Sequence, residues 1–189
     1  ISRVYTLDPK DSADPGHSYR VSVTFDHDGR TLEKSVSIVG LYNAAFDEQY
    51  NYDGELGAIY TPGKTEFRVW SPVSKKIELK VYDTGTPKAI DQTLGNDTPT
   101  HTLEMTKGDR GVYSATINED LEGKYYTYTV YNGNYPNGME IVDPYAKSAG
   151  INGLRGMIVD FSKTNPTNWD EVTLNDADRK ELTVWETHV

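Results

Sequence analysis

Two tyrosines and two asparagines lie within five residues of one another in the second half of the chain, at Tyr131, Asn132, Asn134 and Tyr135. Residues 132–137 are predicted to form a turn, because glycine, asparagine and proline supply most of the segment. A tyrosine ring offers an apolar face and a hydroxyl tip, and an asparagine amide both donates and accepts hydrogen bonds. These groups together suit a ligand that has ring faces and many hydroxyls, such as a sugar.

The segment before this turn decides which tyrosines face solvent. Residues 125–131 are predicted to form a strand, in which successive side chains point to opposite faces. Tyr126 and Tyr128 therefore share one face, and Tyr125 and Tyr131 share the other. We expect one of these two sets to lie in the core.

The chain has 29 acidic residues, but none stands in a pattern that predicts catalysis. Pairs such as Asp47-Glu48 and Glu119-Asp120 fall in predicted turns and are interpreted as solvated surface charge. The four histidines share no ligand spacing, so the sequence predicts no metal site. No phosphate loop, dinucleotide fingerprint or nucleophile elbow is present, and no cofactor is expected.

Composition restricts the partners of the protein. A formal net charge of −10 disfavours nucleic acid and anionic membrane surfaces, because both would be repelled, whereas a neutral glycan would not. No apolar run is long enough for a membrane span. The absence of cysteine excludes disulfides and leaves the compartment open. The first residue, Ile1, favours a processed or excised piece over a native start.

Short alternating segments predict an all-β fold. The expected strands after residue 60 are 65–70, 76–82, 102–106, 111–117, 125–131 and 139–142. Residues 83–100 are predicted to form a long polar loop, and no helix-length segment separates the strands. Such spacing favours a β-sandwich over an α/β sheet. A single short helix is expected at 176–182.

The first 40 residues form a separate predicted unit. Alternation over residues 19–25 indicates a half-buried strand, Asp28-Gly29 indicates a hairpin turn, and a second strand is expected at 35–39. Two strands are too few to close an independent core, so this region is interpreted as the tail of an upstream β-module. Residues 40–51 are expected to be a linker anchored by Phe46.

Four motifs carry a family resemblance. Residues 52–57 (YDGELG), 67–72 (FRVWSP), 143–147 (DPYAK) and 152–157 (NGLRGM) follow one another in an order and spacing that resembles bacterial type I pullulanases. The first two resemble the start of a family-48 carbohydrate-binding module with an immunoglobulin-like β-sandwich. The last two resemble the linker from that module to a catalytic (β/α)8 barrel.

The resemblance bears on individual aromatic residues. Glycogen-binding members of the module family present tryptophans at their sugar site, whereas this chain has none between Trp70 and Trp169. Trp70 itself ends a predicted strand and is expected in the core. The Tyr131 to Tyr135 group is therefore the predicted carbohydrate-binding site.

Residues 182–189 are similar to the first strand of the barrel in the same family. Alternation places Glu186 and His188 on one face, and the resemblance implies that they support the active site and do not perform the chemistry. The resemblance also implies that every catalytic residue lies on later barrel strands. The chain alone is therefore expected to have no hydrolytic activity.

These observations predict three parts: residues 1–40 as the tail of a β-module, 41–160 as the carbohydrate-binding sandwich, and 161–189 as a linker with the first barrel strand. The predicted function is that of the N-terminal, non-catalytic portion of an α-1,6-glucan debranching enzyme, with an α-glucan and the catalytic barrel as partners. An extracellular or cell-surface bacterial location is favoured. The alternatives are a stand-alone glucan-binding or structural module and, from another class, an immunoglobulin-like adhesion domain.

Overall fold

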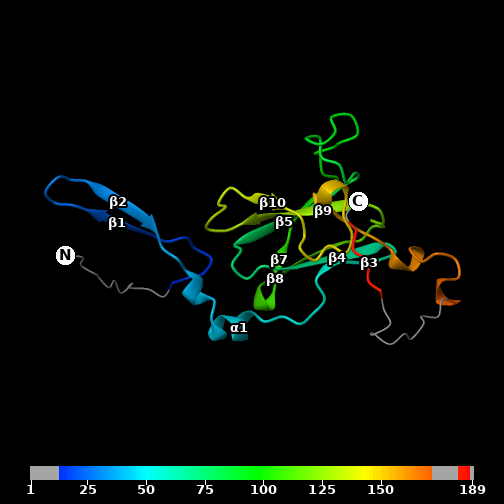
Figure 1. Ribbon diagram of the computed structural model, residues 1–189, viewed down its shortest axis with the longest axis horizontal. Coiled ribbons are helices and arrows are strands. Elements are labelled where there is room, and N and C mark those ends of the chain that lie inside the picture. The colour runs from blue at the N-terminus through cyan, green and yellow to red at the C-terminus, as the bar shows by residue number, and fades with distance from the viewer. Residues whose placement is uncertain (1–12, 172–182, 188–189) are drawn as a thin grey trace. The chain divides into compact units, whose positions relative to one another are not determined.

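The computed structural model describes residues 13–171 and 183–187 (Figure 1). The chain divides into two compact units, Ile1–Val159 and Asp160–Val189. All strands of the described residues belong to the first unit. The fold is therefore almost entirely β, as the sequence predicts.

Two antiparallel sheets form a β-sandwich within the first unit. One sheet has the strand order β3 (Gly57–Thr61), β4 (Lys64–Trp70), β8 (Val112–Ile117) and β7 (Thr106–Lys107). The other has the order β10 (Met139–Ile141), β9 (Tyr125–Tyr131), β5 (Lys76–Tyr82) and β6 (His101–Glu104), and β11 (Gly156–Met157) also pairs with β9. All of these pairings are antiparallel, which agrees with short connections and no helical crossovers.

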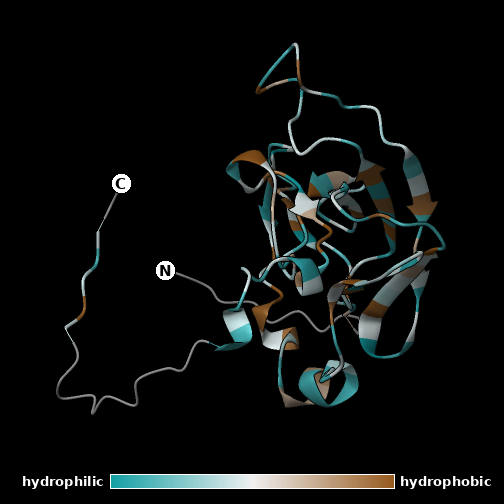
Figure 2. Cartoon of the chain, turned by 90° about the vertical axis from the view of Figure 1, so that its right-hand side faces the viewer, coloured by the Kyte–Doolittle hydropathy of each residue, from teal (hydrophilic) through white to brown (hydrophobic). Residues whose placement is uncertain are grey.

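The core lies between the two sheets and follows from strand alternation. Phe67 and Val69 project inward from β4, and every second residue of β5 and β9 does the same from the opposite sheet. Figure 2 shows the resulting alternation of apolar and polar residues along the strands. Tyr126 and Tyr128 are fully buried, so they are the set of tyrosines that belongs to the core.

The single strand predicted at 102–106 is two strands in two different sheets. β6 pairs with β5, the chain bends at Met105, and β7 pairs with β8. The Met105 side chain is buried, and its amide donates a hydrogen bond to the carbonyl of Ile77. Because this short segment satisfies a hydrogen-bond ladder on each side of the bend, it ties the two sheets together.

Two strands escape prediction from the sequence. β3 begins at Gly57, which has a φ of +96° and belongs to a segment whose glycines predict a turn. The strand continues into β4 through a tight turn at Pro62-Gly63. β11 has only two residues, too few for a periodic pattern. β3 is defined by its hairpin pairing with β4, and β11 by its pairing with β9, and neither is defined by its own composition.

The segment predicted as a linker contains a helix, α1 (Ala44–Tyr50). Asn43 caps it, because its side-chain oxygen accepts hydrogen bonds from the amides of Ala45 and Phe46 at 3.0 and 3.3 Å. Asp47 in the first turn adds a favourable charge near the positive helix end. The cap residue was the available sequence signal for this helix.

The N-terminal hairpin consists of β1 (Arg20–Thr24) and β2 (Thr31–Ser35). The second strand lies four residues earlier than predicted, because the turn at Asp28-Gly29 is tight and pairs Thr24 with Thr31 at once. Nearly every residue of the hairpin is exposed. The assignment of residues 1–40 to an upstream β-module stays a prediction.

The second unit contains two 3-10 turns among its described residues, at Phe161–Lys163 and Trp169–Glu171. Residues 183–187 are exposed and form no strand. The helix predicted at 176–182 lies outside the described residues. Within the described ranges, no helix combines the length and apolarity that a bilayer crossing requires.

Candidate functional site

The predicted site residues lie at the end of β9 and in the turn that follows it. The Tyr131 hydroxyl donates a hydrogen bond to Glu78 at 2.9 Å, and the Lys76 ammonium lies 5.1 Å from the Tyr131 ring centre. Tyr131 is thus half-buried on the outer face of the β9 sheet, as alternation predicts. One face and the hydroxyl of this ring are already in contact with other residues of the protein.

The asparagines of the turn have different roles. The side-chain oxygen of Asn132 accepts hydrogen bonds from the amides of Asn134 and Tyr135 at 2.9 and 3.0 Å, so Asn132 shapes the turn. Asn134 is exposed, and Tyr135 is 46% exposed. The turn therefore presents Tyr135 and Asn134 to solvent, while Asn132 and Tyr131 hold them in place.

A distant segment of the chain lies against this turn. The amide of Gly133 donates to the carbonyl of Gly16 at 3.2 Å, and the Ser18 hydroxyl donates to the carbonyl of Gly133 at 3.2 Å. A Cβ atom at position 133 would lie 2.7 Å from the Ser18 nitrogen, so glycine is required there. The segment before the N-terminal hairpin thus fixes the base of the candidate site, which no local pattern could predict.

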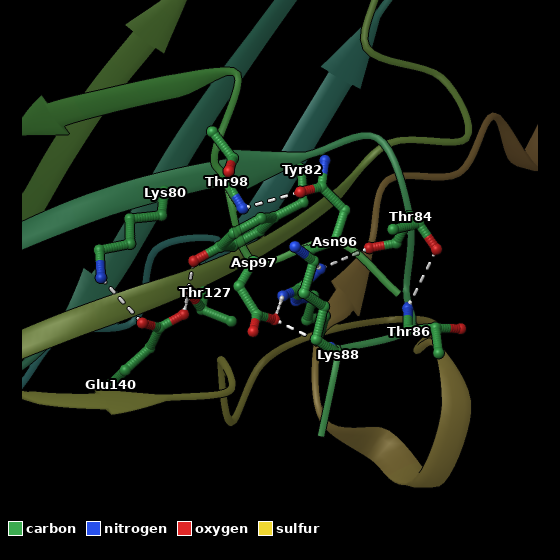
Figure 3. A network of polar contacts seen from close by, with 11 residues as sticks. Lys80, Tyr82, Thr84, Thr86, Lys88, Asn96, Asp97, Thr98, Thr127 and Glu140 are labelled. Carbon is green, nitrogen blue, oxygen red and sulfur yellow. Dashed lines mark hydrogen bonds and ion pairs between the residues drawn. The ribbon is translucent and has the colours of Figure 1, made fainter. Parts of the chain in front are cut away.

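A second polar group lies on the same sheet face, around Glu140 of β10 (Figure 3). Its carboxylate accepts hydrogen bonds from Lys80 at 2.8 Å, from Tyr82 at 2.7 Å and from Thr127 at 2.7 Å. The three donors come from neighbouring outward positions of β5 and β9. In the sequence, Glu140 is predicted only as part of a short strand, and no local pattern indicates this group of side chains.

The contacts of Glu140 set its protonation state. Burial by itself would raise the pKa of Glu140, but the hydrogen bonds from Lys80, Tyr82 and Thr127 outweigh burial and lower it. The pKa of Tyr82 is raised to about 12, first by burial and then by its bond to Glu140. Glu140 is consequently an anion that accepts hydrogen bonds, and it is unsuited to the role of general acid.

Arg155 connects this polar group to the long loop at 83–100. Its guanidinium lies 3.7 Å from the Tyr82 ring centre and donates to the carbonyls of Thr84 and Asn96, each at 2.8 Å. It also forms an ion pair with Asp97 at 3.3 Å. Arg155 is only 4% exposed, so its charge is retained in the interior by these partners.

The two ends of the loop are therefore held beside each other by one side chain, while its middle extends beyond the sheets (Figure 1). Between loop and sheet lies a cavity of about 370 Å³, and Tyr82, Thr127, Glu140 and Arg155 are among its lining residues. The sequence motif that contains Arg155 was a usable signal, but its loop partners lie about 60 and 70 residues away in the sequence.

The opposite face of the same strand pair carries a buried carboxylate. Asp143 accepts hydrogen bonds from the Tyr126 and Tyr128 hydroxyls at 2.7 and 3.3 Å and from the Tyr145 amide at 2.8 Å. Burial raises the pKa of Asp143, although these hydrogen bonds oppose the shift. Burial also raises the pKa values of both tyrosines. The hydrogen bonds of Asp143 therefore anchor the segment 143–147 to the core.

Neither of the two carboxylates described above is suited to act as a catalytic acid. Glu140 is held as an anion, and Asp143 is 3% exposed and out of reach of a ligand. Within the same described ranges, no cluster of three or more His, Asp or Glu side chains could hold a metal ion. The exposed ring of Tyr135 and the hydrogen-bonding groups beside it are suited to binding.

Other predicted residues have other outcomes. The prediction that Trp70 lies in the core was wrong, because Trp70 is half-buried and lies outside the core cluster. Its side chain occupies an outward position of β4, where the indole N–H donates to the carbonyl of Tyr50 at 2.8 Å. Glu186 is exposed in a segment without strand pairing. His188 lies outside the described residues. The proposed support of a barrel by these two residues stays a prediction.

Comparisons with known proteins show which family this chain resembles. Residues 55–146 match Carbohydrate-binding module 48 (Isoamylase N-terminal domain). A pullulanase of Bacillus subtilis is 32% identical over 146 residues, which are 77% of this chain and 18% of the relative. The chain therefore spans less than a fifth of that relative.

Solved structures agree with the sequence matches. The pullulanase of Paenibacillus barengoltzii in complex with maltohexaose and α-cyclodextrin superposes with a TM-score of 0.60 at 37% identity, over 69% of this chain and 19% of that one. The pullulanase of Anoxybacillus sp. LM18-11 complexed with maltotriose gives a TM-score of 0.57 at 38% identity, over 74% and 18% of the two chains. Residues 55–146 therefore form a carbohydrate-binding module 48 domain, in a chain that is similar to the corresponding part of pullulanases.

Proposed function

We propose that this chain is the N-terminal, non-catalytic portion of a pullulanase-type enzyme that hydrolyses α-1,6-glucosidic linkages in pullulan, amylopectin or glycogen-derived α-glucans. The observation that carries the proposal is the similarity to pullulanases over a module-48 domain that makes up a small part of their length. Hydrolysis would belong to a barrel elsewhere in the polypeptide. Residues 182–189, with Glu186 and His188, would contribute its first strand.

The first test is enzymatic. Glycosidic hydrolysis uses two carboxyl groups separated by roughly 5–9 Å, one of which acts as an acid. The resemblance to pullulanases implies that both groups lie on later barrel strands, so the chain is expected to release no reducing ends from pullulan above a boiled control. Measurable release by the pure chain would contradict the proposal that the catalytic residues lie elsewhere.

The role proposed for the module is weak binding of an α-glucan at the turn after β9. Tyr135 and Asn134 are exposed there, and Asn132 and Tyr131 fix the turn from beneath. One exposed ring contributes roughly 1 kcal/mol beyond its buried area, and association costs consume several kcal/mol. A dissociation constant on the order of 1 mM is the expected result.

Calorimetry with α-cyclodextrin and maltohexaose tests this site. Tyr135→Ala is expected to reduce the affinity while leaving the melting temperature nearly unchanged, because its ring is 46% exposed. Tyr42→Ala is a matched control, since that tyrosine is 47% exposed and precedes α1, outside the turn after β9. Equal losses in both variants, or micromolar binding that is unaffected by Tyr135→Ala, would place the site elsewhere.

A second candidate function is a purely structural module. Two of the four predicted site residues already bond within the protein: Tyr131 to Glu78, and Asn132 to the amides of its own turn. If no glucan binds to the chain, while removal of the sandwich destabilises the longer polypeptide, the structural role is the correct one.

A further inference from the structure

A second recess lies between α1 and the neighbouring sheet, on the side of the sandwich formed by β3 and β4. Its volume is about 400 Å³, within the range of small-molecule sites. Six aromatic or aliphatic side chains line it: Phe46, Tyr50, Tyr52, Leu56, Trp70 and Tyr145. It shares Asn51 and Tyr52 with an adjoining hollow beside Arg110, so the two together form a groove.

Side chains of α1 provide one wall of the recess. Phe46 and Tyr50 are spaced by four residues and therefore lie on one face of α1, with ring centres 4.7 Å apart. Tyr42 lies two residues before the helix begins, and its ring centre is 5.0 Å from that of Phe46. Phe46 and Tyr50 face the recess, whereas Tyr42 is not among the residues that line it.

The sandwich holds the end of this helix rigidly. The Trp70 indole donates to the carbonyl of Tyr50 at 2.8 Å, and the Arg110 guanidinium donates to the carbonyls of Glu48 and Asn51 at 3.1 and 3.2 Å. Arg110 has a φ of +54°, an unfavourable conformation for a residue with a side chain. Such strain persists only where the surrounding structure imposes it, so the wall is preorganised.

The opposite wall joins two of the sequence motifs that predicted the family. A Cβ atom at Gly57 would lie 2.7 Å from the Tyr145 carbonyl oxygen, and Lys147 forms an ion pair with Glu55 at 2.7 Å. The Tyr52 ring lies so close to Gly54 that a side chain at position 54 would displace the ring. These contacts bring residues 52–57 and 143–147 together at the recess.

The rim of the recess is polar and lacks a cation within its lining. Asp47 and Asn51 line it and are exposed, so a carboxylate and an amide stand beside the aromatic side chains. An anionic ligand would be repelled by Asp47, whereas hydroxyl groups can donate to a carboxylate and bond to an amide in both directions. Ring faces with such neighbours suit a neutral sugar.

We propose that this recess is a second binding site for an α-glucan oligosaccharide, separate from the turn at 131–135. The inference rests on the proposed function for the choice of ligand, and on the aromatic walls, the polar rim and the fixed helix end for its location. Its rigid walls lower the entropy that binding costs. A chain with two such sites would hold one glucan at two points or two glucan segments at once.

The test is a titration of the ¹⁵N-labelled 189-residue chain with maltohexaose, followed by amide chemical shifts, with cellohexaose as the control sugar. Two groups of amides are expected to shift with maltohexaose, one at residues 46–56 and 145 and one at 131–136. Tyr145→Ala, which removes a 38% exposed ring, is expected to abolish the first group of shifts and retain the second. Asn51→Ala provides a second variant, and Tyr135→Ala, which removes a 46% exposed ring outside the recess, is the matched aromatic control and is expected to retain the first group of shifts.

The outcomes separate this inference from the proposed function. Shifts confined to residues 131–136 overturn the second site and leave the first intact. Shifts nowhere on the chain contradict both. A third outcome is that the backbone amides of residues 46–56 and 145 do not shift with maltohexaose in this chain or in a longer polypeptide, and are protected from hydrogen exchange in the longer one. In that case a protein surface covers the recess, and the sugar assignment is wrong.

Discussion

Tyr126 and Tyr128 project from one face of β9 into the core, whereas Tyr125 and Tyr131 project from the other face toward solvent and surface ion pairs. Each face also has its own carboxylate: Asp143 on the inner side accepts from two buried hydroxyls, and Glu140 on the outer side accepts from Lys80 and two hydroxyls. The same chemistry therefore serves anchoring on one face and an accessible polar surface on the other. The two carboxylates differ in how far folding removes them from water.

The largest effect is expected from Asp143→Ala. This change leaves two buried tyrosine hydroxyls and the Tyr145 amide without their acceptor, at a cost of about 3 kcal/mol in the free energy of unfolding. Urea denaturation measures the loss. Asp83→Ala is the control, because Asp83 is an exposed partner of Lys124 and its removal is expected to cost less than about 1 kcal/mol. Similar losses in both variants would remove the proposed contrast between buried and exposed carboxylates.

A smaller loss is expected from Tyr126→Phe. The ring stays in the core, while the hydroxyl loses its 2.7 Å hydrogen bond to Asp143 and its hydrogen bond with the Ala58 backbone. A hydrogen bond to a charged group contributes about 1.5 kcal/mol or more. Thermal and urea unfolding should both show the decrease. An unchanged stability would indicate that the Tyr128 hydroxyl alone satisfies Asp143.

The two carboxylates are expected to give opposite pH signatures. The pKa of Glu140 is lowered from 4.5 in the fold, so its contribution to stability is present above that value and is lost as the pH falls through the folded pKa. The pKa of Asp143 is raised from 3.8, so its ionisation reduces stability as the pH rises above that value. Stability measured between pH 3 and 6 should therefore depend less steeply on pH in Glu140→Gln and more steeply in Asp143→Asn. Shifts in the same direction in both variants would contradict the assignment.

The smallest effect is expected from Tyr131→Phe. The hydroxyl that it removes bonds to Glu78 on the outer face, where water can replace it. The stability loss should be smaller than that of Tyr126→Phe in the same urea series. A loss equal to that of Tyr126→Phe would mean that the outer face is as desolvated as the inner one.

Much of the sandwich could be predicted from alternation. The boundaries of β5 and β9 agree with the predicted segments at 76–82 and 125–131, because both strands have one fully buried face. The sequence did not predict β11 or the break at Met105, since these depend on which distant strand offers free hydrogen-bonding groups. The sequence did not predict α1, because the helix is short and one of its faces is made of aromatic residues. Only the N-cap residue Asn43 indicated where it starts.

The candidate site divides in the same way. The turn at 132–135 followed from local turn chemistry, and exposure of Tyr135 agrees with its position at the tip. Its support by Gly16 and Ser18, the grouping of Glu140 with Lys80 and Tyr82, and the α1 recess join segments that are far apart in the sequence.

Sequence alone therefore determined the fold class, which β9 tyrosines share a face, and the family that its motifs predict, because these depend on residue type and on spacing along one strand or turn. Only the tertiary structure decided which carboxylates are buried, how Arg155 closes the loop at 83–100, and where aromatic rings meet in the α1 recess. Those features depend on desolvation and on contacts across the sandwich, and the free energy of a charge or a ring is set by the neighbours that folding brings to it.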